Sequence, residues 1–316
     1  MADKQEDSSF RWNDGVKLIA SSSALHHLVA AELAAPVDPR VAAMAAAVAA
    51  EYPQGARAVL FYGSCLRTAD LDGQMLDFYL IVSRYADTYG KSWLARANRL
   101  LPPNVFPFEH DGLAAKYAVL SEADFARECS ARARSVSVWA RFAQPARLVW
   151  SADGAARERT VASVAEAAPT LFALTRPAMP AGERDEPLAV FREGFRLTYG
   201  AELRAERDGR AHSLVDGDPD RYRRFGEMII DEQVIALPPI DAARRRWRRS
   251  QRKGKLLSAA RLAKASLTFV GGVDYIAWKI NRHAGTDIRI KPWQRRWPLL
   301  GALTLLPRLL RRGAIR

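Results

Sequence analysis

The chain has 316 residues, 26% of them charged and 49% hydrophobic, so it can bury a sizeable core and is not a disordered protein. The formal net charge of +13 predicts an anionic partner, either nucleic acid or an anionic membrane. Two cysteines, Cys65 and Cys129, have no metal-ligand spacing and exclude a disulfide framework. The acidic, polar N-terminus is neither a signal peptide nor an arginine-rich transit peptide, and a cytoplasmic location is expected.

The first predicted elements are two helices. Residues 1–15 are expected to be disordered, and residues 16–35 are rich in Ala and Leu and predict a helix that ends before Pro36. A second helix is predicted from Pro39 to Tyr52, with Asp38 as its N-cap. Both helices are expected to pack on a sheet that begins at Ala58.

Two buried strands follow, and each carries one polar feature. The first starts at Ala58 and continues directly into Gly63 and Ser64, while the second, from Met75 to Val82, contains Asp77 in an otherwise apolar run. A Gly-Ser turn lets backbone amides approach a triphosphate, and the serine hydroxyl adds a donor. An aspartate on the neighbouring strand can hold Mg²⁺ against the same phosphates.

This layout is similar to that of the nucleotidyltransferase superfamily, although Asp77 is also compatible with an ordinary residue at a strand edge. The superfamily pattern has a second aspartate two residues further on, where this chain has Tyr79. A second metal ion would therefore need another ligand. The candidates are the nearby acidic residues Asp70, Asp72, Glu109 and Asp111.

The next segments complete the predicted sheet. A helix is expected near residues 91–100, followed by a strand from Leu113 to Ser121 that contains Lys116. A lysine in a half-buried strand either extends to solvent along its apolar stem or, beside a nucleotide, contacts phosphate. A helix from Glu122 to Phe142, with Ser121 as its N-cap, and a strand from Arg141 to Trp150 are then predicted.

The composition becomes polar and small around residues 151–159, which indicates a domain boundary. Residues 160–236 are predicted to be helical, and the aromatic residues Phe191, Phe195 and Tyr199 are spaced as a core stripe. The predicted fold is therefore α+β, a mixed sheet flanked by helices with a helical second domain and a basic C-terminal helical tail. The expected parts are 1–15 disordered, 16–155 with the sheet, 156–240 helical and 241–316 basic.

The C-terminal region concentrates the positive charge. Ten lysines or arginines and one acid lie between Asp241 and Lys264, where a basic run precedes a helix that starts at Leu256. Near the end, a short apolar run at 299–306 is flanked by tryptophans and arginines. The run is too short to span a bilayer. It is typical of a helix in the interface of an anionic membrane, or of a core helix.

Several separated motifs together resemble the mitochondrial-type phosphatidate cytidylyltransferases, the translocator assembly and maintenance family. The matching stretches are Tyr62-Gly63-Ser64, Met75-Leu76-Asp77-Phe78, Lys116-Tyr117-Ala118-Val119-Leu120-Ser121, Arg141 with Pro145, and Ser250-Gln251-Arg252-Lys253-Gly254-Lys255. Cys65 replaces a glycine of the family and Gln144 a lysine, and the expected mitochondrial presequence is absent. The chain is therefore interpreted as a bacterial relative whose acceptor lipid could differ.

The resemblance implies an enzyme that makes CDP-diacylglycerol and pyrophosphate from CTP and phosphatidic acid with Mg²⁺. Gly63, Ser64 and Lys116 would bind the nucleotide, with Ser64 and Asp77 catalytic and Asp77 on the metal. A second set of residues, Arg252, Lys253 and Lys255, would meet the lipid phosphate or the membrane. The protein would be peripheral on the inner face of the cell membrane. The alternative function is nucleic-acid binding or nucleotidyl transfer to a polynucleotide, although no recognisable nucleic-acid module accompanies the basic run.

Overall fold

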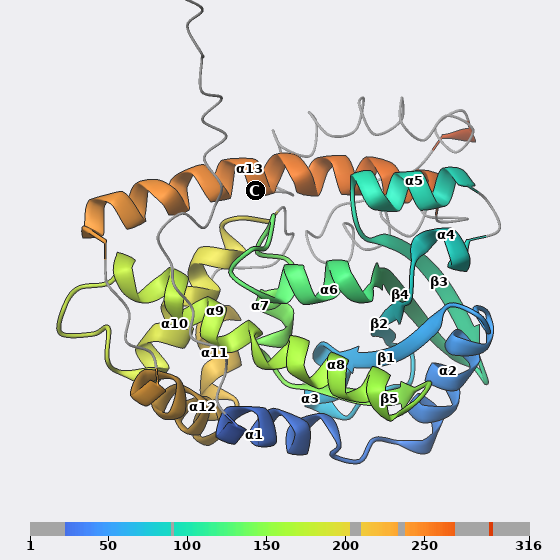
Figure 1. Ribbon diagram of the computed structural model, residues 1–316, viewed down its shortest axis with the longest axis horizontal. Helices are drawn as coiled ribbons and strands as arrows, with labels where there is room; N and C mark the ends of the chain where they lie inside the picture. The colour runs from blue at the N-terminus through green and yellow to red at the C-terminus, as the bar shows by residue number, and fades with distance from the viewer. Residues whose placement is uncertain (1–22, 90–91, 203–209, 233–237, 269–290, 293–316) are drawn as a thin grey trace, which may run out of the picture.

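A five-stranded mixed sheet forms the centre of this protein in a computed structural model that describes residues 23–89, 92–202, 210–232, 238–268 and 291–292. The strands are β1 (Ala56–Tyr62), β2 (Met75–Val82), β3 (Asn104–His110), β4 (Leu113–Ser121) and β5 (Ala146–Ser151). Their order is β3-β4-β2-β1-β5, with β2 and β4 parallel and the other neighbours antiparallel (Figure 1). The predicted α+β fold with a mixed sheet flanked by helices is confirmed.

The helices belong to two groups, one before residue 130 and one after it. The first group is α1 (Ser23–Leu33), α2 (Pro39–Ala50), α3 (Ser64–Thr68), α4 (Tyr85–Thr88), α5 (Ser92–Leu100) and α6 (Glu122–Cys129). The second group is α7 (Trp139–Phe142), α8 (Gly154–Ala165), α9 (Ala167–Thr175), the 3₁₀ helix η1 (Arg176–Ala178), α10 (Pro187–Tyr199), α11 (Arg210–Asp216), α12 (Pro219–Glu232) and α13 (Ile240–Thr268).

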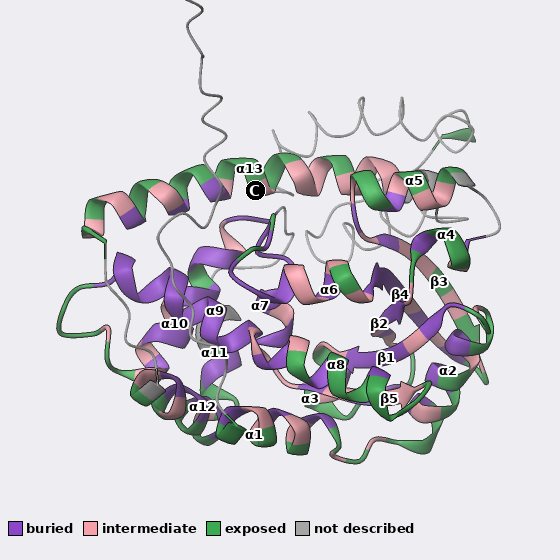
Figure 2. Cartoon of the chain, viewed as in Figure 1, coloured by how far each residue is buried: buried purple, intermediate pink, exposed green. Residues whose placement is uncertain are grey.

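The two faces of the sheet pack against different helices, because successive side chains of a strand point to opposite faces. Leu60 and Tyr79 point to one face and share a core with helix α1 and helices α6 to α13. Phe61 and Phe78 point to the other face and share a core with α2, α3 and α4. In Figure 2 the strands β1 and β2 and helix α9 are largely buried, whereas the outer side of α13 is exposed.

The first of these cores continues through the predicted helical domain. It extends from Leu25 to Trp247 and contains side chains of the sheet as well as Phe172, Phe191 and Phe225 of α9, α10 and α12. The predicted boundary lies where β5 is followed by α8. The division into domains stays a prediction, but the described helices after this point pack in the same apolar core as the sheet.

Several predicted elements have the expected positions. Strands β2 and β4 have the predicted bounds, and Asp38 caps α2 by accepting a hydrogen bond from the Arg40 backbone amide at 2.8 Å. Phe191 and Phe195 are fully buried, as expected for a core stripe. The sequence therefore encodes these elements through local pattern and capping.

Strand β3 is missing from the sequence prediction. It is an edge strand, and it contains Pro107, whose missing N–H group is tolerated at a sheet edge. The turn that joins it to β4 consists of Asp111 and Gly112, with φ angles of 47° and 74°. An Asp-Gly pair with two positive φ angles is a strong hairpin signal, and it could have identified this strand.

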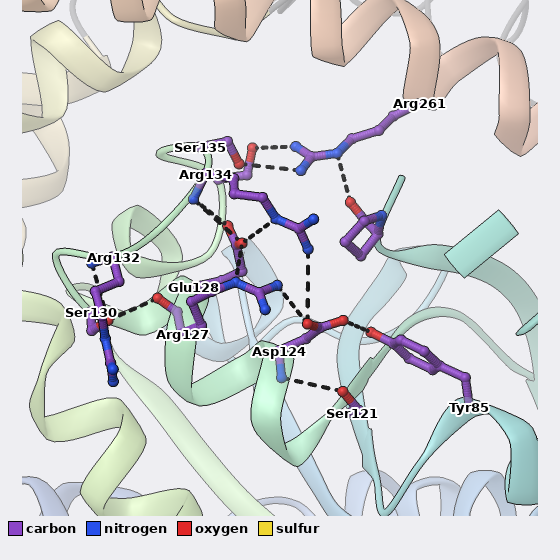
Figure 3. A network of polar contacts seen from close by, with 12 residues as sticks. Tyr85, Ser121, Asp124, Arg127, Glu128, Ser130, Arg132, Arg134, Ser135 and Arg261 are labelled. Atoms are coloured by element: carbon purple, nitrogen blue, oxygen red, sulfur yellow. Dashed lines mark hydrogen bonds and ion pairs between the residues drawn. The ribbon is translucent and has the colours of Figure 1, made fainter. Parts of the chain in front are cut away.

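The prediction of one continuous helix from Glu122 to Phe142 is wrong. Helix α6 starts after the Ser121 cap as expected but ends at Cys129, and α7 begins only at Trp139. The segment between them contains serines and valines, which are weak helix formers. It is held by side chains instead, because buried Glu128 accepts a hydrogen bond at 3.2 Å from Nε of Arg134 (Figure 3).

The basic run was expected to precede a helix from Leu256 to Lys264, but it is itself helical. Helix α13 includes the whole run, because Arg, Lys and Ala are good helix formers. Its buried residues Ala243, Trp247 and Ser250 recur every three or four positions and face the protein. Four of the arginines between them are exposed, Arg244, Arg245, Arg248 and Arg249, whereas Arg246 is half-buried.

Side-chain hydrogen bonds attach both halves of α13 to the rest of the protein. Near its start, Nε1 of Trp247 donates to the Leu174 carbonyl at 2.8 Å. Further along, Arg261 donates to the Pro102 carbonyl at 2.8 Å and to the Ser137 hydroxyl at 2.9 Å (Figure 3 draws the Arg261 contacts). Lys264 donates to the Pro103 carbonyl at 2.7 Å. These bonds fix the orientation of the helix about its axis.

Lys264 should make the stability of the protein depend on pH. Burial, together with the charge of Arg261, lowers the pKa of Lys264 to about 7. Between pH 7 and its unfolded pKa of about 10.4, the unfolded chain binds more protons at this residue than the folded chain does. The Lys264 contribution to the unfolding free energy should therefore rise with pH across this window, by up to about 1.4 kcal/mol per pH unit.

Urea unfolding of wild type and Lys264→Met at several pH values between 7 and 10 measures this effect. The substituted protein should show a smaller increase in unfolding free energy over the window. The control is Lys255→Met, which removes an exposed lysine of the same helix and should keep the wild-type slope. Equal slopes in all three proteins would rule out the assigned pKa.

Two predicted segments, the disordered residues 1–15 and the interfacial tail at 293–316, lie outside the described residues and stay predictions. In the part of the chain that the structure describes, no helix has the length and apolar character needed to cross a membrane.

Candidate functional site

The glycine-serine turn and Asp77 lie against each other, as the sequence predicts. Gly63 joins the end of β1 to α3, and its φ of 100° is a conformation that side chains with a Cβ rarely adopt. A Cβ atom at this position would lie only 2.9 Å from Oδ2 of Asp77. The carboxylate therefore faces the turn, and the glycine leaves room for it. Ser64, the first residue of α3, is exposed beside this turn.

Asp77 and Lys116 form an ion pair on the same face of the sheet. The two residues are partners in the parallel pairing of β2 with β4, and Nζ of Lys116 lies 2.6 Å from Oδ1 of Asp77. The Asp77 side chain is 20% exposed and the Lys116 side chain 23% exposed, so this pair lies at the surface of the core rather than inside it. Lys116 does not extend away to solvent along its stem. It lies beside the Asp77 carboxylate, which is the predicted metal ligand.

Tyr62 and Arg141 complete the surroundings of Asp77. Tyr62 is the strand partner of Asp77 in β1, and burial together with the Asp77 charge raises the pKa of its hydroxyl. Arg141 is half-buried, and the loss of solvent around it opposes its charge, but the Glu202 carboxylate at 3.0 Å and the neighbouring tyrosines raise its pKa well above the ordinary value. The guanidinium also donates to the Ser137 carbonyl. Arg141 therefore stays charged next to Tyr62.

Two of these neighbours differ in how well the sequence could have identified them. Tyr62 precedes the turn and pairs with Asp77 across the antiparallel strands β1 and β2, so it could have been placed near the carboxylate once these two consecutive strands were taken as neighbours. Arg141 lies at a position of the family resemblance, but nothing in the sequence indicates its ion pair with Glu202, 61 residues away.

Comparison with known protein families and with curated proteins finds no match to this sequence. One solved structure that the fold comparison finds is that of a nucleotidyltransferase-like protein from Exiguobacterium sibiricum. The comparison has a TM-score of 0.25 and 11% sequence identity, and it covers 87% of this chain and 91% of that one. Similarity at this level assigns no family. The site is interpreted below from its own geometry.

The acidic residues near the turn form no ready-made metal cluster among the residues that the structure describes. Within the described residues, no group of three or more His, Cys, Asp or Glu side chains is arranged to hold a metal ion. The four second-ligand candidates, Asp70, Asp72, Glu109 and Asp111, therefore form no such cluster with Asp77. Mg²⁺ commonly uses only one or two carboxylates together with substrate phosphates and water. Asp77, partly exposed and facing the Gly63 turn, has the chemistry of one such ligand.

Cys65 follows the turn but is unsuited to act as a nucleophile. Burial, and secondarily the charge of Asp77, raise the pKa of its thiol. A thiol is reactive as the thiolate, which these surroundings disfavour. The structure therefore indicates a packing role for Cys65 in the core beneath the turn.

The three cations assigned to the lipid phosphate or membrane, Arg252, Lys253 and Lys255, lie on the exposed side of α13. Gly254 between them faces Ala201 so closely that a Cβ would collide with its backbone carbonyl. This contact brings α13 close to the end of α10. The cations consequently point to solvent, and their predicted contact with lipid stays a prediction.

Proposed function

We propose that this protein transfers a cytidylyl group from CTP to a lipid phosphate, making CDP-diacylglycerol and pyrophosphate when the acceptor is phosphatidic acid. The observation that carries this proposal is the carboxylate of Asp77, which faces the Gly63 turn at the end of the neighbouring strand. The family resemblance of five separated motifs supports the lipid acceptor, as do the exposed cations of α13. The enzyme would work in the cytoplasm, at the inner face of the cell membrane.

The residues of the site have distinct tasks in this reaction. The turn at Gly63 lets the backbone approach the triphosphate, and the exposed hydroxyl of Ser64 adds a donor. Lys116 holds one oxygen of Asp77 and adds positive charge beside the phosphates. Asp77 would hold Mg²⁺ with its other oxygen, and this ion, when bound, neutralises charge on the phosphates.

The transfer needs no nucleophile from the protein. An oxygen of the acceptor phosphate forms a bond to the α-phosphorus, the bond from that phosphorus to its bridging oxygen breaks, and pyrophosphate leaves with the electron pair. The acceptor is already an anion, so no base has to remove a proton first. This agrees with the buried, protonated state of Cys65. The protein's contribution is to position the two substrates and to compensate their charges.

Pyrophosphate release with each of the four nucleoside triphosphates, with and without phosphatidic acid vesicles, tests this proposal. We expect release with CTP, Mg²⁺ and phosphatidic acid, and CDP-diacylglycerol as the product identified by mass spectrometry. Release that requires a polynucleotide end instead of lipid would support the alternative acceptor, because exposed arginines also bind nucleic-acid phosphates. No release with any nucleotide and either acceptor would overturn the proposal.

A further inference from the structure

The large hydrophobic side chains that are exposed in the described part of the chain all lie on two helices. They are Trp93 and Leu100 of α5, which are 47% and 84% exposed, and Leu256 of α13, which is 72% exposed. Scattered apolar residues are ordinary on a protein surface. Their restriction to two neighbouring helices is a different observation, and it points to a shared surface.

Helix α5 has one apolar side in contact with the protein and a second one that faces solvent. Leu94 and Ala95 pack against the core, and the buried Asn98 donates to the Val119 carbonyl at 2.9 Å. Trp93, Arg96 and Leu100 are exposed at spacings of three and four residues, which places them on one outer side. The outer side of α5 therefore combines a tryptophan and a leucine with an arginine.

Helix α13 lies next to the end of α5. Arg261 donates to the carbonyl of Pro102, and Lys264 to that of Pro103, so α13 contacts the segment that follows Leu100 directly (Figure 1). The exposed side of α13 carries Leu256 together with Arg252 and Lys253. Both helices thus combine exposed apolar side chains with cations, at neighbouring places on the protein.

We propose that this α5–α13 face, formed by Trp93, Arg96 and Leu100 with Arg252, Lys253 and Leu256, docks on an anionic membrane. The apolar side chains would enter the headgroup region, and the cations would contact lipid phosphates, as in helices that lie in a membrane interface. A nucleic acid would satisfy the cations but would leave the two leucines in water. The inference rests on the proposed function in one respect, because an enzyme with a lipid acceptor needs a membrane-binding face. Vesicle binding by the α5–α13 face can be measured without any turnover.

Vesicle flotation of the full chain tests the face, with phosphatidylcholine vesicles that do or do not contain phosphatidic acid. The triple variant Trp93→Ala, Leu100→Ser, Leu256→Ser should bind anionic vesicles about tenfold more weakly or worse, because burial of even one leucine-sized side chain is worth roughly that factor. The charge variant Arg96→Glu, Arg252→Glu, Lys253→Glu should lose binding and its salt dependence. The control Arg157→Glu, which reverses an exposed arginine on α8, should bind like wild type.

Thermal unfolding and turnover of a water-soluble short-chain phosphatidic acid separate the possible failures. Both variants should keep the wild-type melting temperature. The triple variant, which changes no residue assigned to the site, should also keep short-chain turnover while losing turnover on vesicles. Wild-type vesicle binding by the triple variant would overturn the docking face, as would binding that is lost only when residues 293–316 are deleted. Salt-sensitive binding to nucleic acid without vesicle binding would overturn it too. Vesicle binding by this face without pyrophosphate release would support the face and overturn the proposed function alone.

Discussion

Replacing Asp77 by asparagine should lower CTP-dependent pyrophosphate release by at least about a hundredfold. The carboxylate is the acidic group that faces the Gly63 turn, and an amide cannot replace its charge on a metal ion. Metal-ion stabilisation of a phosphoryl transition state is worth several kcal/mol, and each 1.36 kcal/mol changes the rate about tenfold. Steady-state pyrophosphate release at saturating CTP measures the loss.

Two variants make this result specific. Asp72→Asn removes an exposed carboxylate that pairs with Arg40 at 2.9 Å, and it should keep wild-type turnover. Asp77→Asn also leaves Lys116 without its ion-pair partner Asp77, so thermal unfolding of this variant tests whether a loss of stability alone causes the loss of turnover. If Asp77→Asn retained activity, or if Asp72→Asn lost as much, Asp77 would not be the metal ligand.

Replacing Arg221 by methionine should destabilise the fold by about 3–5 kcal/mol, the usual cost of leaving a buried charge without its partner. Arg221 of α12 is only 5% exposed in its side chain, and its Nη2 donates to Glu32 of α1 at 2.9 Å. It also donates to the Ala143 carbonyl at 3.2 Å and lies over the rings of Tyr222 and Phe225. The substitution leaves the Glu32 carboxylate without the positive charge that balances it in the folded protein.

Urea unfolding at neutral pH measures this loss, with Arg223→Met as the matched control. Arg223 lies on the same helix but is 50% exposed in an ion pair with Asp220, and its loss should cost less than about 1 kcal/mol. The double variant Glu32→Met with Arg221→Met should recover part of the stability, because it removes both charges together. A loss for Arg221→Met no larger than that for Arg223→Met would show that the ion pair is not a buried one in solution.

Local patterns in the sequence predict much of the sheet and the centre of the site. The glycine before Ser64 indicates a turn with room for a carboxylate, and the family resemblance adds Lys116 to Asp77, whereas their common face is set by the strand register that the structure shows. The predicted strands β2 and β4 and the capped start of α2 need no information beyond the residues within each segment. This is why the turn and the carboxylate could be grouped from the residues alone, whereas Lys116 was added to them only through the family resemblance.

The remainder depends on contacts between residues that are distant in the sequence. The break between α6 and α7 is stabilised by Glu128 and Arg134 and by the bond from Arg261 to Ser137, which lies 124 residues earlier. Glu32 and Arg221 are 189 residues apart. No periodic pattern encodes such pairs. The continuous helix at 240–268 was interrupted in the prediction because a dense positive charge was interpreted as a partner surface rather than as a helix with one buried side.

The apolar core that joins one face of the sheet to helices α8 to α12 has a consequence for how the molecule loses its structure. Side chains from both sides of residue 155 interlock in it, from Leu25 to Trp247, so neither part keeps its apolar surface covered when the other opens. Melting of one part then exposes the other, and the whole described assembly should come apart in a single cooperative transition. Loss of the ion pair between α1 and α12 should therefore destabilise the sheet around the Gly63 turn as well.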